Sequence, residues 1–279
     1  MIQWFNSRSA FEQATRNIPY DRQATENDLQ QRGLRGWCIA CSTIVDFEIR
    51  RAPIWTNLRE AIICPRCQLN SRMRMMVSAL GRFGTQHKLH ILERFTPFYV
   101  FLEKRFPKLT GSEFLGPDYK PGSKHKLKGL EGIEVEHQDF MNLSFPDSSL
   151  QLLIHGDVLE HVPDPWRAFR EAARVIKPAG TMLFTVPFFD SEKNVVRARL
   201  EKGVLRHLLP EAYHGNPMHP EKGSLVFTEP GWQMLDDLQR AGFKSAEIGF
   251  CYDPFQGIVS SNSPTPQNFM WPVIFRARR

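Results

Sequence analysis

Between residues 142 and 187 the spacing of apolar positions changes twice, which predicts a strand, a helix and a second strand in close succession. Leu150 to His155 is a short apolar run with turn residues on both sides, as expected of a buried strand. Apolar residues then recur every three or four positions from Val158 to Ile176, which predicts one face of an amphipathic helix. A proline and a glycine stop this helix before the next apolar run, Thr181 to Val186. A strand–helix–strand unit of this kind predicts an α/β fold built on a parallel sheet.

The same periodicities predict further elements along the chain. We expect strands at 43–49, 89–92, 109–113, 133–136, 246–252 and 270–276, and helices at 9–14, 69–80 and 232–241. Two apolar runs, 195–200 and 204–209, predict a pair of helices inside an insertion at about 190–229. Residues 1–36 are polar and mixed in charge, which predicts an N-terminal arm that packs on the surface or is partly disordered.

Four of the five cysteines form two C-x-x-C pairs, Cys38 with Cys41 and Cys64 with Cys67. Each pair can sit on a tight turn that points both sulfurs at one ion, and two such turns complete a tetrahedral four-sulfur site. Because four thiolates leave no open position for water, we expect a structural Zn²⁺ in a ribbon-like module with its connecting helix at 37–82. Four buried or redox-active thiols are the alternative. Cys251 is expected to be an inert core thiol.

The formal net charge of +6 permits an anionic partner without requiring one. Arginines outnumber acidic residues around the cysteines, so nucleic acid is a possible partner, although a solvated face that also balances the thiolates accounts for the charge and is favoured. These arginines are Arg50, Arg51, Arg59, Arg66, Arg72, Arg74 and Arg82. No apolar run approaches the roughly 20 residues that span a bilayer, and the N-terminus lacks a signal-peptide pattern, so we expect a cytoplasmic protein without a membrane partner.

Four segments resemble, in this order, the motifs of class I S-adenosylmethionine-dependent methyltransferases. They are Asn142-Leu-Ser-Phe-Pro-Asp-Ser-Ser-Leu, Val158-Leu-Glu-His-Val-Pro-Asp, Arg174-Val-Ile-Lys-Pro-Ala-Gly and Phe184-Thr-Val-Pro. The resemblance is closest to the methyltransferase type 11-like subgroup and covers roughly residues 88 to 277. It implies a Rossmann-like seven-stranded sheet with helices on both faces, in a domain at 83–279, and S-adenosylmethionine as the methyl donor. Gln151 and Ala179 are two mild departures from the subgroup pattern.

The main departure lies after the first strand of this domain. Glu93 matches the acidic residue that opens the cofactor loop of the family, but the usual glycines are absent. Thr96 and Pro97 supply a helix start instead, whose free N–H groups could face the methionine carboxylate of the cofactor. A family variant with a zinc-ribbon front and an E-x-x-T-P-x-Y loop is similar over nearly the whole chain.

The resemblance implies further cofactor-binding residues. Glu113 ends the second strand and would accept hydrogen bonds from the two ribose hydroxyls. Asp139 would take the adenine amino group, while Phe114 and Phe140 would flank the adenosine. Beyond the fourth strand, the cofactor site continues with His155, Gly156 and Asp157.

The Glu-His pair of the family corresponds to Glu160 and His161, which makes them candidates for removing a proton from an acceptor hydroxyl. The alternative is structural, with Glu160 capping the helix and His161 hydrogen-bonded within the fold. His214 is a further candidate catalytic residue. It lies in the insertion with Tyr213, Asn216 and His219, where substrate contacts are expected, and a metal pair from His214 and His219 is not favoured.

The pattern as a whole favours O-methylation of a small-molecule or glycan acceptor. An RNA methyltransferase is a second possibility, because a four-ligand zinc finger also precedes some ribosomal-RNA methyltransferase domains. Against it, His155-Gly-Asp-Val stands where an amino-methylating N-P-P-Y-type tetrapeptide would be expected. A third reading is a non-catalytic, zinc-binding interaction protein that has lost its glycine loop. The sequence leaves the acceptor and the oligomeric state open.

Overall fold

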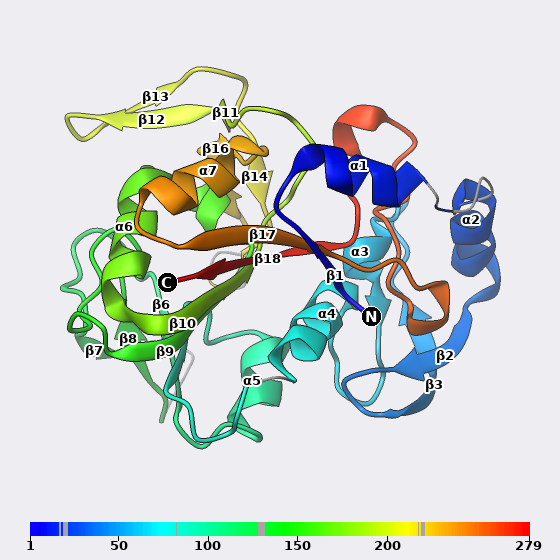
Figure 1. The fold of residues 1–279 in the computed structure, drawn as a ribbon, viewed down its shortest axis with the longest axis horizontal. Helices are drawn as coiled ribbons and strands as arrows, with labels where there is room; N and C mark the ends of the chain where they lie inside the picture. The colour runs from blue at the N-terminus through cyan, green and yellow to red at the C-terminus, as the bar shows by residue number, and fades with distance from the viewer. Residues whose placement is uncertain (17, 19–21, 82, 128–131, 217, 219–220) are drawn as a thin grey trace. The chain divides into compact units, whose positions relative to one another are not determined.

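The structure is a computed structural model that describes the chain apart from residues 17, 19–21, 82, 128–131, 217 and 219–220 (Figure 1). The chain forms two compact units. The first comprises Met1–Gly84, Phe188–Asp190 and Glu247–Phe275, and the second comprises Thr85–Pro187, Ser191–Ala246 and Arg276–Arg279. Strands β17 (Ser245–Phe250) and β18 (Val273–Arg278) have residues in both units.

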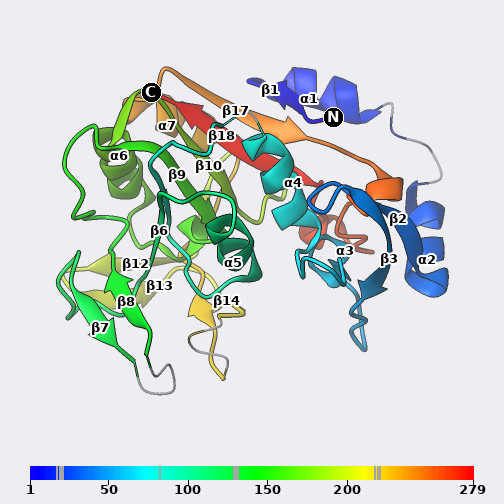
Figure 2. The same cartoon turned by 90° about the horizontal axis from the view of Figure 1, so that it is seen from below.

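The second unit is built on a largely parallel sheet, which confirms the predicted α/β class. Its strands lie in the order β10-β9-β5-β6-β8-β7, with β7 antiparallel to β8 and the other neighbours parallel (Figure 2). They are β5 (Leu89–Ile91), β6 (Leu109–Glu113), β7 (Lys124–Lys126), β8 (Glu134–His137), β9 (Leu150–Gly156) and β10 (Ile176–Thr185). The chain order reverses between β5 and β9, and open α/β sheets bind ligands at the carboxyl ends of strands beside such a reversal.

Three α-helices of the second unit are α5 (Pro97–Glu103), α6 (Pro165–Val175) and α7 (Gln233–Arg240). The predicted helix from Val158 begins later than expected. A 3₁₀ turn, η1 (Leu159–His161), comes first, and Asp164 caps α6 by accepting a hydrogen bond from the Arg167 amide. The reason is Pro163, which has no N–H to donate within a helix. Trp166, one of the apolar residues on the face of the helix predicted at 158–176, is 41% exposed.

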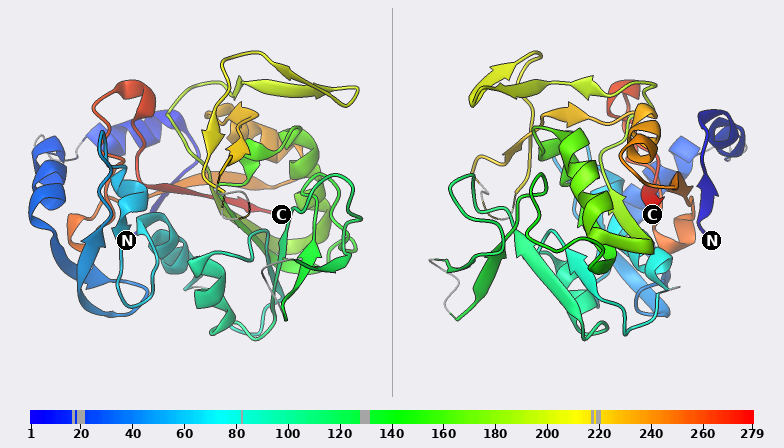
Figure 3. Two further views of the ribbon diagram at one scale, coloured as in Figure 1. Left: turned by 180° about the vertical axis from the view of Figure 1, so that it is seen from behind. Right: turned by 60° about the vertical axis from the view of Figure 1, so that its left-hand side comes forward.

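The helix pair predicted in the insertion is wrong, because this segment forms strands. They are β11 (Val195–Val196), β12 (Ala198–Glu201), β13 (Val204–His207), β14 (Tyr213–His214), β15 (Ser224–Leu225) and β16 (Thr228–Glu229). β12 and β13 form the antiparallel hairpin drawn in yellow in Figure 3. Lys202 and Gly203, the two residues at its tip, have φ of 51° and 81°, as the type I′ turn of a tight hairpin requires. This turn chemistry overrides the apparent helical spacing.

The first unit carries the cysteines on a three-stranded antiparallel sheet. Its strands are β2 (Leu34–Cys38), β3 (Thr43–Ile49) and β4 (Ile62–Ile63), followed by α4 (Ser71–Leu80). The predicted strand at 43–49 and the helix leading away from the cysteines are therefore confirmed. Shorter elements of this unit are α3 (Leu58–Ala61), η2 (Pro254–Gln256) and η3 (Pro266–Asn268).

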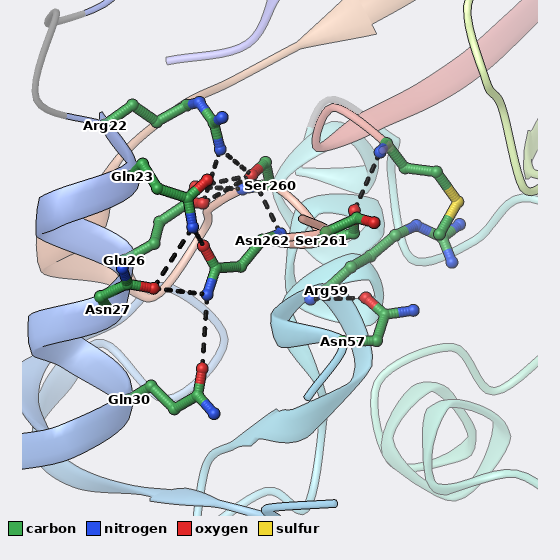
Figure 4. A network of polar contacts seen from close by, with 12 residues as sticks. Arg22, Gln23, Glu26, Asn27, Gln30, Asn57, Arg59, Ser260, Ser261 and Asn262 are labelled. Atoms are coloured by element: carbon green, nitrogen blue, oxygen red, sulfur yellow. Dashed lines mark hydrogen bonds and ion pairs between the residues drawn. The ribbon is translucent and has the colours of Figure 1, made fainter. Parts of the chain in front are cut away.

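The N-terminal segment forms regular secondary structure, and the helix predicted at 9–14 is confirmed. It forms β1 (Gln3–Phe5), which pairs with β17, and two helices, α1 (Arg8–Arg16) and α2 (Arg22–Arg32). Figure 4 shows how α2 is held: Glu26, completely buried, accepts hydrogen bonds from the hydroxyl and amide of Ser260 at 2.7 and 2.9 Å. Arg22 donates to the other Glu26 oxygen at 2.7 Å. A polar sequence can thus be fixed when its charges find partners distant in the chain.

Within the described part of the chain, no helix has both the length and the apolar character needed to cross a bilayer.

Candidate cofactor and metal sites

The four paired cysteines converge in the first unit. The Sγ atoms of Cys38 and Cys67 lie 3.8 Å apart, as do those of Cys41 and Cys64, and all four sulfurs are within 4.8 Å of one another. Sulfur ligands about 2.3 Å from one zinc ion at the tetrahedral angle are separated by about 3.8 Å. The spacing of the sulfurs therefore fits a tetrahedral zinc site with four cysteine ligands.

Both C-x-x-C pairs sit on tight turns, as the sequence predicts. The amide of Cys41 donates to the carbonyl of Cys38 at 3.2 Å, and that of Gln68 donates to the carbonyl of Cys64 at 2.9 Å. Ser42 and Gln68, one residue beyond each pair, adopt left-handed backbone conformations with φ of 52° and 62°. These turns bring the two sulfurs of each pair into one cluster.

The thiols of the cluster do not ionise equally. A hydrogen bond from the Cys67 thiol lowers the pKa of Cys38 to about 5, whereas burial raises the pKa of Cys41 to about 11. One thiolate thus forms readily at Cys38, and the thiol of Cys41 resists ionisation beside it. A divalent ion removes this conflict, because a coordinated thiol is deprotonated outright.

Arg74, on α4, provides a buried positive charge for the same unit. Its guanidinium donates to the carbonyls of Ile62 and Leu69 at 2.9 and 2.8 Å, and to those of Gln256 and Gly257 at 3.1 Å each. Burial lowers the pKa of Arg74, while the cysteines of the cluster favour its charged form. Sequence reasoning counted Arg74 only as one of seven basic residues, because nothing local marks an arginine for burial.

We expect Arg74→Met to lower the free energy of unfolding of the first unit by about 3–5 kcal/mol, since several buried carbonyls lose their donor together with a buried charge. Urea unfolding followed by hydrogen exchange in residues 34–80 measures the change. The matched control is Arg66→Met, an exposed arginine between Cys64 and Cys67. Equal stability of the two variants would contradict the assigned role.

The other arginines near the cysteines do not form one solvated face. Arg59 is 3% exposed and pairs with Glu60 at 2.5 Å, and Arg72 reaches the same carboxylate at 3.0 Å. Arg51 donates to the main-chain carbonyl of Gln30 at 2.7 Å. Arg82 lies outside the described residues. Much of the basic charge is therefore used within the fold, which argues against a nucleic-acid surface here.

In the second unit, two glutamates join the loops at the carboxyl ends of β5, β6 and β9. Glu93, two residues after the end of β5 and 7% exposed, accepts a hydrogen bond from the Gly156 amide at 2.8 Å. Glu113, the last residue of β6, accepts from the amides of Arg94 and Phe95 at 2.7 and 3.0 Å. Both predicted acidic residues thus stand at the reversal of the sheet, where a ligand is expected.

The glycine-free loop after β5 leads into a helix that begins at Thr96 and Pro97, as predicted. Thr96 caps α5 by accepting from the Tyr99 amide at 3.2 Å, with Pro97 in the first turn. The amides of Arg94 and Phe95 face Glu113, so these loop donors are used by a carboxylate of the protein itself. Gly111 on β6 explains how the helix packs closely, because a Cβ there would collide with the Tyr99 ring.

Aromatic rings gather beside Glu113. Phe114 is 54% exposed, and its ring centroid lies 5.5 Å from that of His137, which in turn lies 5.8 Å from Tyr119. Exposed rings next to a carboxylate fit a nucleoside, which offers a flat base and two hydroxyls. Asp139 uses Oδ1 to accept from the Met141 amide at 2.8 Å, so it also shapes its own turn.

The end of β9 is held by buried contacts. His155 is completely buried, stacks on Phe184 at 4.8 Å and meets the edge of Phe140 at 5.1 Å. Burial lowers its pKa to about 3, so the ring is neutral, and a contact of His155 with a cofactor would use its main chain. Asp157 follows with a φ of 54° and accepts from the Thr185 hydroxyl at 2.8 Å. A non-glycine residue in this conformation is a form of strain that clusters at functional sites.

Glu160, His161 and His214 come together just beyond β9. Nδ1 of His214 lies 3.5 Å and Nε2 of His161 lies 3.7 Å from the same atom, Oε1 of Glu160. The Glu160 side chain is 1% exposed, and neither of its oxygens has a hydrogen-bond partner. The structure therefore brings the three predicted catalytic residues into one cluster, although they lie up to 54 positions apart in the sequence.

The β14–β15 hairpin positions two members of this cluster. It carries His214 on β14, and Nδ1 of His161 lies 2.8 Å from the carbonyl oxygen of Leu225 on β15. Since a carbonyl only accepts, Nδ1 carries the proton and the neutral ring presents the lone pair of Nε2 to Glu160. Sequence reasoning missed Leu225, because a main-chain acceptor leaves no residue signature. Of the other predicted contacts, Tyr213 and Asn216 lie in this segment, and His219 falls outside the described residues.

Comparison with known proteins identifies one segment of the second unit that matches a protein family. Residues 102–184 match the family model of a methyltransferase domain. The match begins in α5 and ends in β10, so it includes Glu113, Asp139, Gly156 and the Glu160–His161 pair.

Known proteins similar to this chain include two small-molecule methyltransferases. A demethylmenaquinone methyltransferase of Staphylococcus epidermidis is 38% identical over 76 residues, which cover 27% of this chain and 31% of that protein. A 27-O-demethylrifamycin SV methyltransferase of Amycolatopsis mediterranei is 31% identical over 112 residues, covering 36% and 41%. The chain thus spans well under half the length of these relatives. An S-adenosylmethionine-dependent methyltransferase structure from Mesorhizobium loti aligns with a TM-score of 0.48 at 18% identity, covering 76% of this chain and 100% of that one.

Proposed function

We propose that this protein transfers the methyl group of S-adenosylmethionine to a hydroxyl of a small-molecule or glycan acceptor, with a structural zinc ion in its first unit. The observation that carries the proposal is the joining of β5, β6 and β9 by Glu93 and Glu113 at the reversal of the sheet. The two methyltransferases to which the chain is similar support a small molecule as the acceptor.

The residues of the second unit fit the parts of the cofactor. Glu113 would accept hydrogen bonds from the ribose hydroxyls, and Phe114 would cover the adenosine from the solvent side. Asp139 and Phe140 stand one strand further on, at the end of β8, where the adenine is expected. The bound cofactor would supply a methyl group on a positively charged sulfur, and the protein would hold that group in line with the acceptor oxygen.

Glu160, His161 and His214 are proposed to act on the acceptor. Loss of the hydroxyl proton makes the oxygen a better nucleophile, and a positioned proton acceptor accelerates such a step by about 10²–10⁴-fold. The Leu225 carbonyl holds the ring proton of His161 on Nδ1, so the lone pair of Nε2 can accept the hydroxyl proton.

Glu113→Gln tests the cofactor site. Glutamine can still accept from the Arg94 and Phe95 amides, so the loop should persist while the charge is lost. We expect weaker binding of S-adenosylhomocysteine by roughly 1.5–3 kcal/mol, or about 10- to 150-fold, as for other hydrogen bonds to a charged group. Calorimetric titration measures this, with Glu134→Gln, an exposed glutamate on β8, as the control. If wild type gives no heat at high micromolar ligand, the enzyme proposal fails.

The pH dependence of this binding has a defined sign. Burial raises the pKa of Glu113 above its ordinary value. The carboxylate is the form that accepts from ribose, so affinity is greatest above that pKa and falls as Glu113 is protonated. We expect the decline to begin at a higher pH than for an ordinary glutamate, and to be absent in Glu113→Gln. Identical pH profiles for the two proteins would contradict it.

Transfer of labelled methyl from S-adenosylmethionine to phenols, hydroxylated quinols, sugars and ribosomal RNA identifies the acceptor class. Labelling of RNA that weakens steeply with salt would support the RNA reading instead. Cofactor binding without transfer to any acceptor would leave the non-catalytic reading.

A further inference from the structure

The buried carboxylate of Glu160 faces two nitrogen atoms without a hydrogen bond to either. N–H···O hydrogen bonds in proteins measure about 2.7–3.2 Å, whereas the two nitrogen–oxygen distances here are 3.5 and 3.7 Å. In its neutral form His161 turns a lone pair toward the carboxylate, because its proton is on the Leu225 side. Two acceptors that face each other in a buried place need a cation between them.

The spacing matches ligands around one metal ion. Nitrogen and oxygen atoms about 2.0–2.2 Å from zinc at the tetrahedral angle lie about 3.3–3.6 Å apart. The observed distances of 3.5 and 3.7 Å agree within a few tenths of an ångström, and all three ligand atoms lie within 4.8 Å of one another. The four sulfurs of the first unit likewise lie at the distances expected of ligands around one tetrahedral ion.

We propose that Glu160, His161 and His214 bind a divalent transition-metal ion, such as zinc, separate from the four-cysteine site. Two imidazoles and one carboxylate are borderline ligands that suit zinc or cobalt. Three protein ligands leave a fourth position open, which is the arrangement of catalytic rather than structural zinc. The Leu225 carbonyl supplies the outer hydrogen bond that orients a metal-binding histidine.

The role of the ion rests on the proposed methyl transfer, with the bound ion in place of a histidine that accepts the hydroxyl proton. An acceptor hydroxyl at the open position would lose its proton to water, because a bound divalent ion strongly lowers the pKa of an oxygen ligand. A lone pair of that oxygen would form the new bond to the methyl carbon. The carbon–sulfur bond would break with its electron pair passing to sulfur, which leaves neutral S-adenosylhomocysteine. The preferred acceptor would then be a hydroxyl compound that can coordinate the ion.

The test is metal titration of the full chain after removal of bound ions, using cobalt(II) and zinc as probes. We expect wild type to bind two ions. His214→Ala and Glu160→Gln should each weaken the second ion by more than about 100-fold, because even outer-shell partners are worth about 10–100-fold. Both should keep the ion that shows thiolate-to-cobalt charge-transfer absorption. Cys64→Ser should lose that absorption and keep the second ion.

His207→Ala is the matched control, because His207 lies in the same insertion and pairs with Glu211 at 3.3 Å. His214 is partly exposed, so its loss should leave the fold intact, and Glu160→Gln preserves the shape of the side chain. A wild type that binds one ion, with thiolate absorption only, overturns the proposal. A second ion unaffected by both substitutions does so as well.

Failure of the second metal site can be distinguished experimentally from failure of the proposed methyl transfer. If the second ion binds but S-adenosylhomocysteine does not, the metal site stands and methyl transfer is refuted. If labelled methyl is transferred by a chain with only its cysteine-bound ion, methyl transfer stands and the second site is refuted.

Discussion

Replacing Cys64 with serine should remove about one metal ion per chain and loosen the first unit more than any other single change. Structural zinc is worth about 10–16 kcal/mol in zinc-finger peptides, and a three-stranded sheet with such short strands has little core of its own. Residues 34–70 should gain hydrogen exchange and protease sensitivity first. The second unit should keep its affinity for S-adenosylhomocysteine, because none of the residues proposed to bind the cofactor lies in the first unit.

Cys251→Ser is the control for this experiment. Cys251 is also buried and belongs to the same unit, but it stands outside the four-cysteine cluster. Its substitution should leave the metal content unchanged. If Cys64→Ser retains its full metal content, or if both variants lose the same amount, the cysteines do not form the proposed site.

His161→Ala should reduce kcat for the best acceptor by about 10²–10⁴-fold, the range of a positioned proton acceptor. The dissociation constant of S-adenosylhomocysteine should stay the same, because His161 lies beyond the residues assigned to the cofactor. This split between an impaired rate and intact binding separates a role at the acceptor from a general loss of structure. Methyl transfer to the acceptor found by labelling, together with calorimetry, measures both quantities.

His207→Ala should behave like wild type in the same assay, since its ring lies outside the Glu160 cluster. A His161→Ala enzyme with the wild-type rate would remove His161 from the reaction. Catalysis would then rest on positioning alone.

The sequence determined the elements whose signals are local. The apolar run that became β9 is buried, because a parallel strand has neighbours on both faces, and its limits follow from the flanking turn residues. The strand 109–113 was placed correctly to the residue. The cysteine spacing was enough to predict a four-sulfur cluster, because a C-x-x-C turn fixes where its two sulfurs point.

Predictions from the sequence were wrong where one short-range pattern of apolar residues is compatible with two secondary structures. The apolar residues at 195–209 suit a helix by spacing, but the Lys202–Gly203 turn folds them into a hairpin. The N-terminal 36 residues lack an apolar face, and α2 is nevertheless fixed by Glu26 bonding to Ser260, 234 positions away. Local propensity carries no information about a partner at that distance.

The tertiary structure alone decided which polar groups meet. Glu93 with Gly156, Arg74 with four carbonyls, and Glu160 with two histidines are all contacts between separate elements. The family motifs pointed to Glu160 and His161, but the distance from His214 and the bond to Leu225 depend on how the β14–β15 hairpin closes over η1. Burial without a hydrogen-bond partner is a property of the folded chain, and it is what makes Glu160 a metal ligand in our proposal.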